Sequence, residues 1–77
     1  MTRAHWIVRG HVQGVNFRYT TKQEASALGL ECRVWNRADG AVECVADGPD
    51  QALDLLERWL HRGPPLARVD AVERLAG

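Results

Sequence analysis

The chain of 77 residues is long enough for one small domain, and a domain of this size buries only about 60% of the surface that its unfolded chain exposes. Hydrophobic residues make up 45% of the chain and charged residues 26%, which is typical of a folded globular protein and excludes a disordered one. Ten basic and ten acidic residues leave a formal net charge of zero, so the overall charge gives no reason to expect a polyanion as partner. We therefore expect a single domain over residues 1–77, in which any affinity for anions is local.

Residues 5–12 are predicted to form the first strand. The side chains on one of its faces are apolar or absent, at Trp6, Val8, Gly10 and Val12. Such alternation is typical of a strand that buries one face. A helix is predicted over residues 19–28, because small and apolar side chains recur there at helical spacing. Gly29 suits the left-handed residue that often follows a helix end.

Residues 31–37 and 41–47 are rich in Val, Cys and Trp and are predicted to pair as a hairpin, because Asp-Gly at 39–40 is a turn signal. A three-residue loop places the apolar side chains of both strands on one face, whereas a two-residue loop would mix them with acidic residues. The face so formed contains Cys32, Val34, Val42, Cys44 and Ala46. Asn36 is then the polar residue at the end of an otherwise apolar stripe.

A second helix is predicted to begin at Pro49, since proline at the first helical position gives up only an amide that would have no partner. Its apolar face contains Leu53, Leu56 and Leu60. Residues 67–75 are predicted to be the last strand, and their imperfect alternation indicates a bulge or an edge position. The order of elements is βαββαβ. It predicts an α+β, ferredoxin-like two-layer sandwich, with a four-stranded antiparallel sheet and two helices on one face.

The segment 10–18, between the first strand and the first helix, is the strongest candidate for a site. Gly10 and Gly14 permit backbone conformations that a side chain would forbid, and the amides that follow run into a helix N-terminus, where anions bind. Arg18 adds a planar fork of donors that matches carboxylate or phosphate. In a ferredoxin-like fold this segment lies near the hairpin, which would bring Arg18 close to Asn36. The predicted phosphate-binding residues are Gly14, Val15, Asn16, Phe17 and Arg18.

Three segments match a known pattern: GHVQGVNFR at 10–18, VWNRADGAVE at 34–43, and DGP at 47–49. Through them the chain resembles the acylphosphatase family over nearly its whole length. The resemblance implies an enzyme that hydrolyses the carboxyl–phosphate anhydride of small acyl phosphates, with no metal or other cofactor. It also implies two catalytic residues, Arg18 as the arginine that binds phosphate and Asn36 as the asparagine that orients the attacking water.

At two positions this chain differs from the family's pattern. Asn16 stands where members carry residues of varied kind, so its amide either alters the phosphate site or is simply solvated. Trp35 lies two places later in its strand than the tryptophan of the family pattern, which keeps it on the same side of that strand. Both differences bear on how the substrate fits.

Two other classes of function remain open from the sequence. RNA-recognition domains share the order of elements and stack bases on aromatic side chains of the open sheet face. Residues 41–47 contain no aromatic and two acids, and only Arg33 and Trp35 on the neighbouring strand favour this reading, so we expect no nucleic acid partner. A phosphate-binding module without catalysis is the other reading, and a turnover assay distinguishes it. We expect a monomer that binds a small acyl phosphate.

The remaining reactive side chains are predicted to be structural or solvated. No His or Cys lies at the usual spacing of a zinc site, so no metal site is predicted. Cys32 and Cys44 are diagonal in the hairpin register, with Cα atoms about 7–8 Å apart, too far for an easy disulfide. His5 and His11 fall on the face away from the helices. The N-terminus has no apolar run typical of a signal peptide or membrane span, so we expect a cytoplasmic protein without membrane association.

Overall fold

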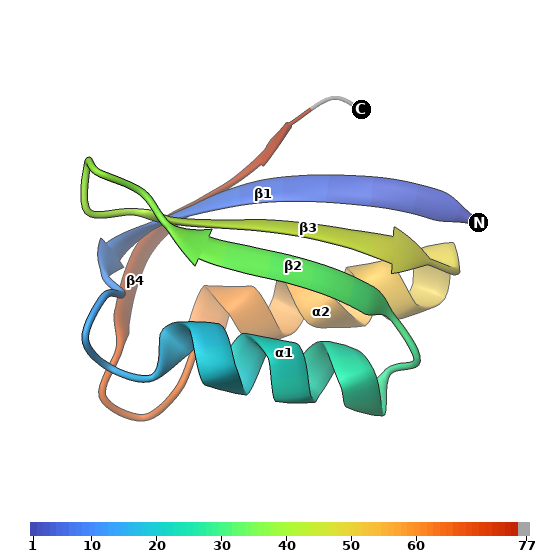
Figure 1. Ribbon diagram of the computed structural model, residues 1–77, viewed down its shortest axis with the longest axis horizontal. Helices are drawn as coiled ribbons and strands as arrows, with labels where there is room; N and C mark the ends of the chain where they lie inside the picture. The colour runs from blue at the N-terminus through green and yellow to red at the C-terminus, as the bar shows by residue number, and fades with distance from the viewer. Residues whose placement is uncertain (76–77) are drawn as a thin grey trace.

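The computed structural model of the protein describes residues 1–75 and confirms the predicted α+β fold. The elements are β1 (Thr2–His11), α1 (Phe17–Ala27), β2 (Glu31–Asn36), β3 (Val42–Gly48), α2 (Asp50–Arg62) and β4 (Arg68–Leu75). The strands form one antiparallel sheet in the order β2-β3-β1-β4. Both helices cover the same face of this sheet, which gives a ferredoxin-like sandwich of two layers (Figure 1).

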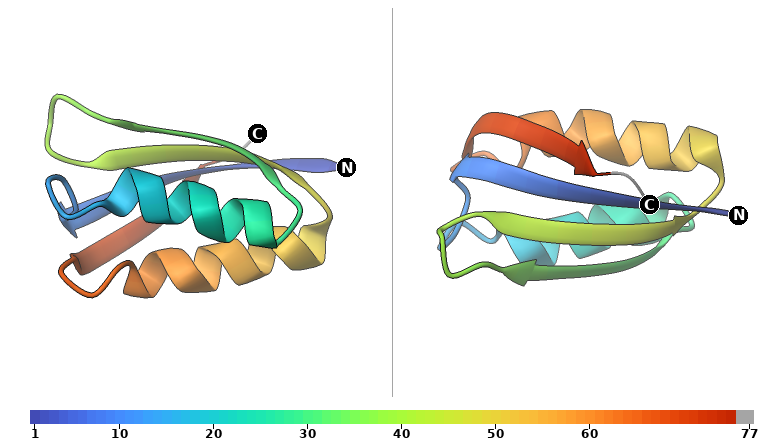
Figure 2. Two further views of the ribbon diagram at one scale, coloured as in Figure 1. Left: turned by 60° about the horizontal axis from the view of Figure 1, so that its bottom comes forward. Right: turned by 90° about the horizontal axis from the view of Figure 1, so that it is seen from above.

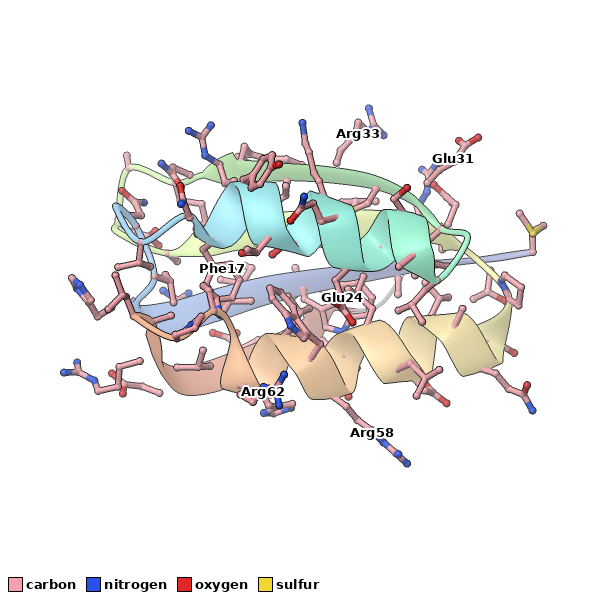
Figure 3. The ribbon with its side chains drawn as sticks, turned by 90° about the horizontal axis from the view of Figure 1, so that it is seen from below. Phe17, Glu24, Glu31, Arg33, Arg58 and Arg62 are labelled. Carbon is pink, nitrogen blue, oxygen red and sulfur yellow. The ribbon has the colours of Figure 1, made fainter. Side chains whose placement is uncertain are left out.

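The core lies between the sheet and the two helices. The helices bury the faces that the sequence predicts, with Thr21 and Ala25 on α1 and a leucine stripe on α2. The largest side chains that the core buries fully are Trp6, Phe17, Leu53, Leu56 and Leu60. Phe17 packs against Trp59 of α2, with 5.7 Å between ring centroids, and Figure 3 shows it beneath the first turn of α1. Because Phe17 is also the first residue of α1, this packing fixes where the helix begins.

The β2–β3 hairpin has the predicted three-residue loop. The Arg37 amide donates to the Ala41 carbonyl at 2.8 Å, and the Gly40 amide donates to the Arg37 carbonyl at 3.2 Å. Asn36 is paired with Val42, as the register predicts. Asn36 is exposed, whereas the other residues of its stripe are buried or, at Cys32, partly buried, so its amide group lies at the end of the apolar layer, next to solvent.

The Asp39 carboxylate holds the turn of the hairpin together. It accepts hydrogen bonds from the Arg37 guanidinium at 3.2 Å, from the Ala41 amide at 3.1 Å and from Arg9 at 3.3 Å. These bonds, with that from Arg37 the largest, lower the pKa of Asp39 to about 2. The turn that carries Asn36 is therefore tied to an ionised carboxylate.

We expect the hairpin to lose stability in acid. The pKa of Asp39 is lower in the folded protein than its unfolded value of about 3.9, so its stabilisation is complete above about pH 4 and is lost as the pH falls toward 2. Thermal unfolding followed by circular dichroism between pH 6 and pH 2 measures this. Asp39→Asn keeps an acceptor for the Ala41 amide but cannot titrate, so its Tm should vary less between about pH 4 and 2. Identical pH profiles for both proteins would contradict the assignment.

The two thiols lie close together but form no disulfide. Cys32 and Cys44 are diagonal across β2 and β3, and both are free, yet their Sγ atoms are 3.4 Å apart. The spacing of two Cα atoms does not fix where the sulfur atoms lie when both side chains project from one face. Hydrogen bonding to Cys32, together with burial, raises the pKa of the Cys44 thiol. Cys44 is fully buried and Cys32 partly buried, in keeping with the role of small core residues.

The pairing of β4 with β1 contains a bulge, and β4 lies at the edge of the sheet, as its imperfect alternation indicates. The register shifts between Arg9, which faces Ala71, and Gly10, which faces Val69. Gly10 has a φ of 133°, and a Cβ at this position would collide with the Arg68 carbonyl oxygen. The position therefore requires glycine, and the chain turns toward α1 immediately beyond it.

We expect Gly10→Ala to lower the free energy of unfolding by about 2–4 kcal/mol, because it adds both backbone strain and a collision with β4. Urea unfolding at neutral pH measures the loss. Gly29→Ala is a matched control: Gly29 also has a positive φ, 75°, but its Cβ would point into open space. That control should lose only about 1 kcal/mol. Equal losses for the two variants would show that the contact with β4 is unimportant.

Candidate functional site

Three loops meet at one end of the molecule, as both the side view and the turned view show (Figures 1 and 2). They are the β1–α1 loop, the turn of the β2–β3 hairpin, and the α2–β4 loop. A cavity of about 380 Å³ opens there. It is lined by Val12, Gly14, Val15, Asn16, Phe17, Arg18, Tyr19, Asn36 and Leu66. The fold thus brings every predicted site residue to one cavity.

The β1–α1 loop has an unusual backbone. Gly14 has a φ of 77°, and Asn16 adopts the left-handed conformation with φ 64° and ψ 22°. Within residues 1–75, Asn16 is the only residue other than glycine with a positive φ. Asparagine tolerates this conformation better than most side chains, which explains its presence at a position where the sequence pattern left its role open. Turns of this kind direct successive amides into a concave, anion-binding surface.

The amides at the beginning of α1 are free to bind a ligand. Hydrogen bonding of the helix begins with the Thr20 amide, which donates to the Asn16 carbonyl at 3.1 Å. The amides of Phe17, Arg18 and Tyr19 precede it and have no acceptor within the helix. The first turn of α1 contains no acidic residue, whereas α2 has Asp50 in its first turn. The partial positive charge at the start of α1 is therefore not offset by a carboxylate of its own first turn.

The Arg18 guanidinium is exposed and lines the cavity. Within the described part of the chain it makes no ion pair, while Arg9 and Arg37 pair with Asp39. A guanidinium without an ion pair and amides without a helical acceptor thus belong to residues that line the same cavity. The arrangement is suited to an anion with several oxygen atoms.

Gln13 ties the β1–α1 loop to the hairpin. Its Nε2 donates to the Arg37 carbonyl at 2.7 Å and to the Ala41 carbonyl at 2.9 Å. Both carbonyls belong to the neck of the hairpin: Arg37 directly follows Asn36, and Ala41 directly precedes Val42, the residue paired with Asn36. The bridge therefore sets the spacing between the free amides and the Asn36 side chain, a link that depends on one glutamine.

The cavity is also lined by three residues outside the predicted binding set: Val12, which lies within the segment 10–18, Tyr19 and Leu66. Tyr19 directly follows Arg18, so its position in the chain was a signal. Leu66 lies on the α2–β4 loop, far away in sequence, and carries no motif. Only the packing of the loops reveals that it belongs to this end of the molecule.

The open face of the sheet carries charges that satisfy one another. Glu43 accepts hydrogen bonds from His5 and from Arg37, and Arg9 pairs with both Asp39 and Glu73. His5 thus lies on the face of the sheet away from the helices, as the sequence predicts. Arg33 makes no ion pair within residues 1–75, so of the features that favour a base-stacking surface only Arg33 and the exposed Trp35 remain on this face.

Metal-binding clusters and membrane-spanning helices are both absent from residues 1–75. In that part of the chain no group of three or more His, Cys, Asp or Glu side chains is arranged to hold a metal ion. Its helices are also too short or too polar to cross a membrane.

The fold and the cavity together define a small α+β domain in which a glycine-containing loop, an arginine and an amide side chain line one cavity. Comparisons with known proteins agree with this class. A sequence model of the acylphosphatase family matches residues 4–75. An acylphosphatase from Xanthomonas euvesicatoria is 54% identical over 76 residues, which cover 99% of this chain and 86% of that protein.

Solved structures give the same result. A crystal structure of acylphosphatase from Bacillus subtilis superposes with a TM-score of 0.94 at 39% identity, covering 97% of this chain and 83% of that one. An acylphosphatase from Coxiella burnetii superposes with a TM-score of 0.92 at 40% identity, covering 96% of this chain and 78% of that one. The chain belongs to the acylphosphatase family, whose members are hydrolases that act on acid anhydrides.

Proposed function

We propose that this protein hydrolyses the carboxyl–phosphate anhydride bond of small acyl phosphates, giving a carboxylate and inorganic phosphate, without a metal ion. One observation carries the proposal: Arg18, Asn36 and the free amides at the start of α1 line a single cavity. The family supplies the reaction class, and the cavity supplies groups that suit it. The protein acts in this proposal as a single domain and as a monomer.

The phosphoryl group is bound by the β1–α1 loop. Amides from Val15 to Arg18 donate to its oxygens, and the Arg18 guanidinium holds two of them at once. The left-handed residues at Gly14 and Asn16 aim these amides before the substrate arrives, so little reorganisation is needed when charge moves in the transition state.

The attacking water is bound by Asn36. Its side-chain amide can accept a hydrogen bond from the water and hold it in line with the phosphorus and the leaving carboxylate oxygen. The water oxygen forms the new bond to phosphorus while the bond from phosphorus to the acyl oxygen breaks, and the electron pair leaves with the carboxylate. A phosphate oxygen takes the proton of the water, since no side chain of the cavity is assigned as a base.

An acyl phosphate needs little more than this. Its leaving group is a stable carboxylate, so the barrier falls mainly through positioning and through stabilisation of charge on the phosphoryl oxygens. The helix start and Arg18 provide the charge, and Asn36 provides the positioning.

The test is hydrolysis of acetyl phosphate and benzoyl phosphate in the presence of EDTA. The release of inorganic phosphate measures the rate. We expect turnover that EDTA does not change and that inorganic phosphate inhibits competitively. Turnover that needs an added metal would overturn the mechanism. Phosphate binding without turnover would show a binding module that lacks catalysis.

A further inference from the structure

The cavity has an apolar side that phosphate chemistry does not use. Five large apolar side chains are exposed within residues 1–75, at Met1, Tyr19, Trp35, Leu55 and Leu66. Two of the five, Tyr19 and Leu66, line the same cavity as Arg18. Tyr19 is 62% exposed and Leu66 is 78% exposed, so neither contributes much to the core. Packing of the core therefore does not explain why both side chains lie at this cavity.

The size of the cavity agrees with a ligand larger than phosphate. Its volume of about 380 Å³ lies within the usual range for small-molecule sites, about 300–1,000 Å³. Its lining includes Arg18 and the residues at the start of α1, together with Tyr19 and Leu66. An acyl phosphate bound by its phosphoryl group therefore finds apolar side chains in the same cavity for its acyl group to contact.

Hydrogen bonds outside the core hold both apolar residues in place. The Tyr19 hydroxyl accepts a hydrogen bond from Gln23 Nε2 at 2.9 Å, one turn further along α1. Leu66 lies in a tight turn, closed by the Ala67 amide, which donates to the Pro64 carbonyl at 3.0 Å. The Tyr19 ring is therefore held by a side-chain hydrogen bond and Leu66 by a closed turn, although both side chains are open to solvent.

We propose that Tyr19 and Leu66 form an apolar rim that binds the acyl group of the substrate and favours aromatic or branched apolar acyl phosphates over acetyl phosphate. The proposal rests on the proposed function. A benzoyl group buries apolar surface against the rim, whereas an acetyl group is too small to reach both residues. Contacts of this size discriminate between substrates by about 10-fold or more.

The experiment compares kcat/KM for benzoyl phosphate and acetyl phosphate in Tyr19→Ala, Leu66→Ala and the double variant. We expect the single variants to lose about threefold to tenfold with benzoyl phosphate, mainly through KM, and little with acetyl phosphate. Inhibition by inorganic phosphate should not change, because the amides and Arg18 remain. Comparing the ratio of the two substrates across variants cancels their different intrinsic reactivity.

Two matched controls separate the rim from general effects. Tyr19→Phe keeps the ring and removes only the bond to Gln23, so it should retain most of the preference for benzoyl phosphate. Leu55→Ala removes an apolar side chain of α2 that is 48% exposed but does not line the cavity, and it should change neither substrate. All these residues are exposed, so we expect each variant to fold with a near-normal Tm.

Equal losses with both substrates, or none, would overturn the rim while leaving the hydrolase assignment intact. If the unchanged protein hydrolysed neither substrate, the hydrolase assignment would fail first, and the rim with it. A selective loss with benzoyl phosphate supports both.

Discussion

Replacing Arg18 with alanine is expected to lower kcat/KM for acetyl phosphate by about 10²–10³, equivalent to about 3–4 kcal/mol of transition-state stabilisation. The guanidinium lines the cavity and makes no ion pair within residues 1–75, so its removal takes away a charge that nothing else in the described site replaces. Affinity for inorganic phosphate should fall as well, because the same charge binds substrate and product. Steady-state kinetics with phosphate as inhibitor measures both effects.

Arg18→Lys tests geometry as opposed to charge. A lysine keeps the positive charge but lacks the planar fork that donates two parallel hydrogen bonds, so we expect this variant to remain well below the unchanged protein. Arg58→Ala is the control for net charge: Figure 3 shows Arg58 on α2, pointing away from the rest of the molecule. It should keep full activity. An Arg18→Ala variant with near-normal turnover would rule out the proposed site.

The sequence predicted the hairpin in detail because its signals are local. An Asp-Gly pair sets the turn, and the condition that the apolar residues share one face selects a single register. That register predicts the pairing of Asn36 with Val42, which is confirmed. The place of Asn36 at the cavity end of β2 therefore follows from the turn and the apolar pattern of the hairpin itself.

The start of α1 was harder to predict. The periodic pattern indicated a helix from residue 19, but α1 begins at Phe17, because this ring packs against Trp59 and Asn16 takes a left-handed conformation just before it. Both causes depend on tertiary contacts or on a special backbone angle, and neither appears in the helical spacing. The difference matters, since it places the amides of Phe17 and Arg18 in the first turn of the helix.

Leu66 could not be predicted from the chain as a residue of the site. Leu66 reaches the cavity only because α2 ends at the same end of the molecule as the β1–α1 loop (Figure 2). Gln13 lies inside the segment that the sequence singled out, but its bonds to two carbonyls of the hairpin neck depend on packing. Contacts between loops depend on how whole elements pack, whereas periodicity and turn signals describe each element alone.

Replacing Asn36 with alanine is expected to lower kcat by about 10² or more while leaving inhibition by inorganic phosphate unchanged. In the proposed mechanism Asn36 contacts the water and not the phosphoryl group, so its loss removes an interaction that matters in the transition state and not in the bound ground state. Kinetics with acetyl phosphate, together with the phosphate inhibition constant, separates these two contributions. Similar losses of turnover and of phosphate binding would point to a disturbed site instead.

The alternative for Asn36 is a purely structural role beside the turn, and Tm distinguishes it. Asn36 is exposed, and the turn is held by Asp39 and by the Gln13 bridge, so Asn36→Ala should unfold near the normal temperature. Asn36→Asp has nearly the same shape but adds a negative charge, which repels phosphate, so it should lose both turnover and phosphate inhibition. Normal stability, weak turnover and intact phosphate binding in Asn36→Ala are expected together only if this amide orients the water.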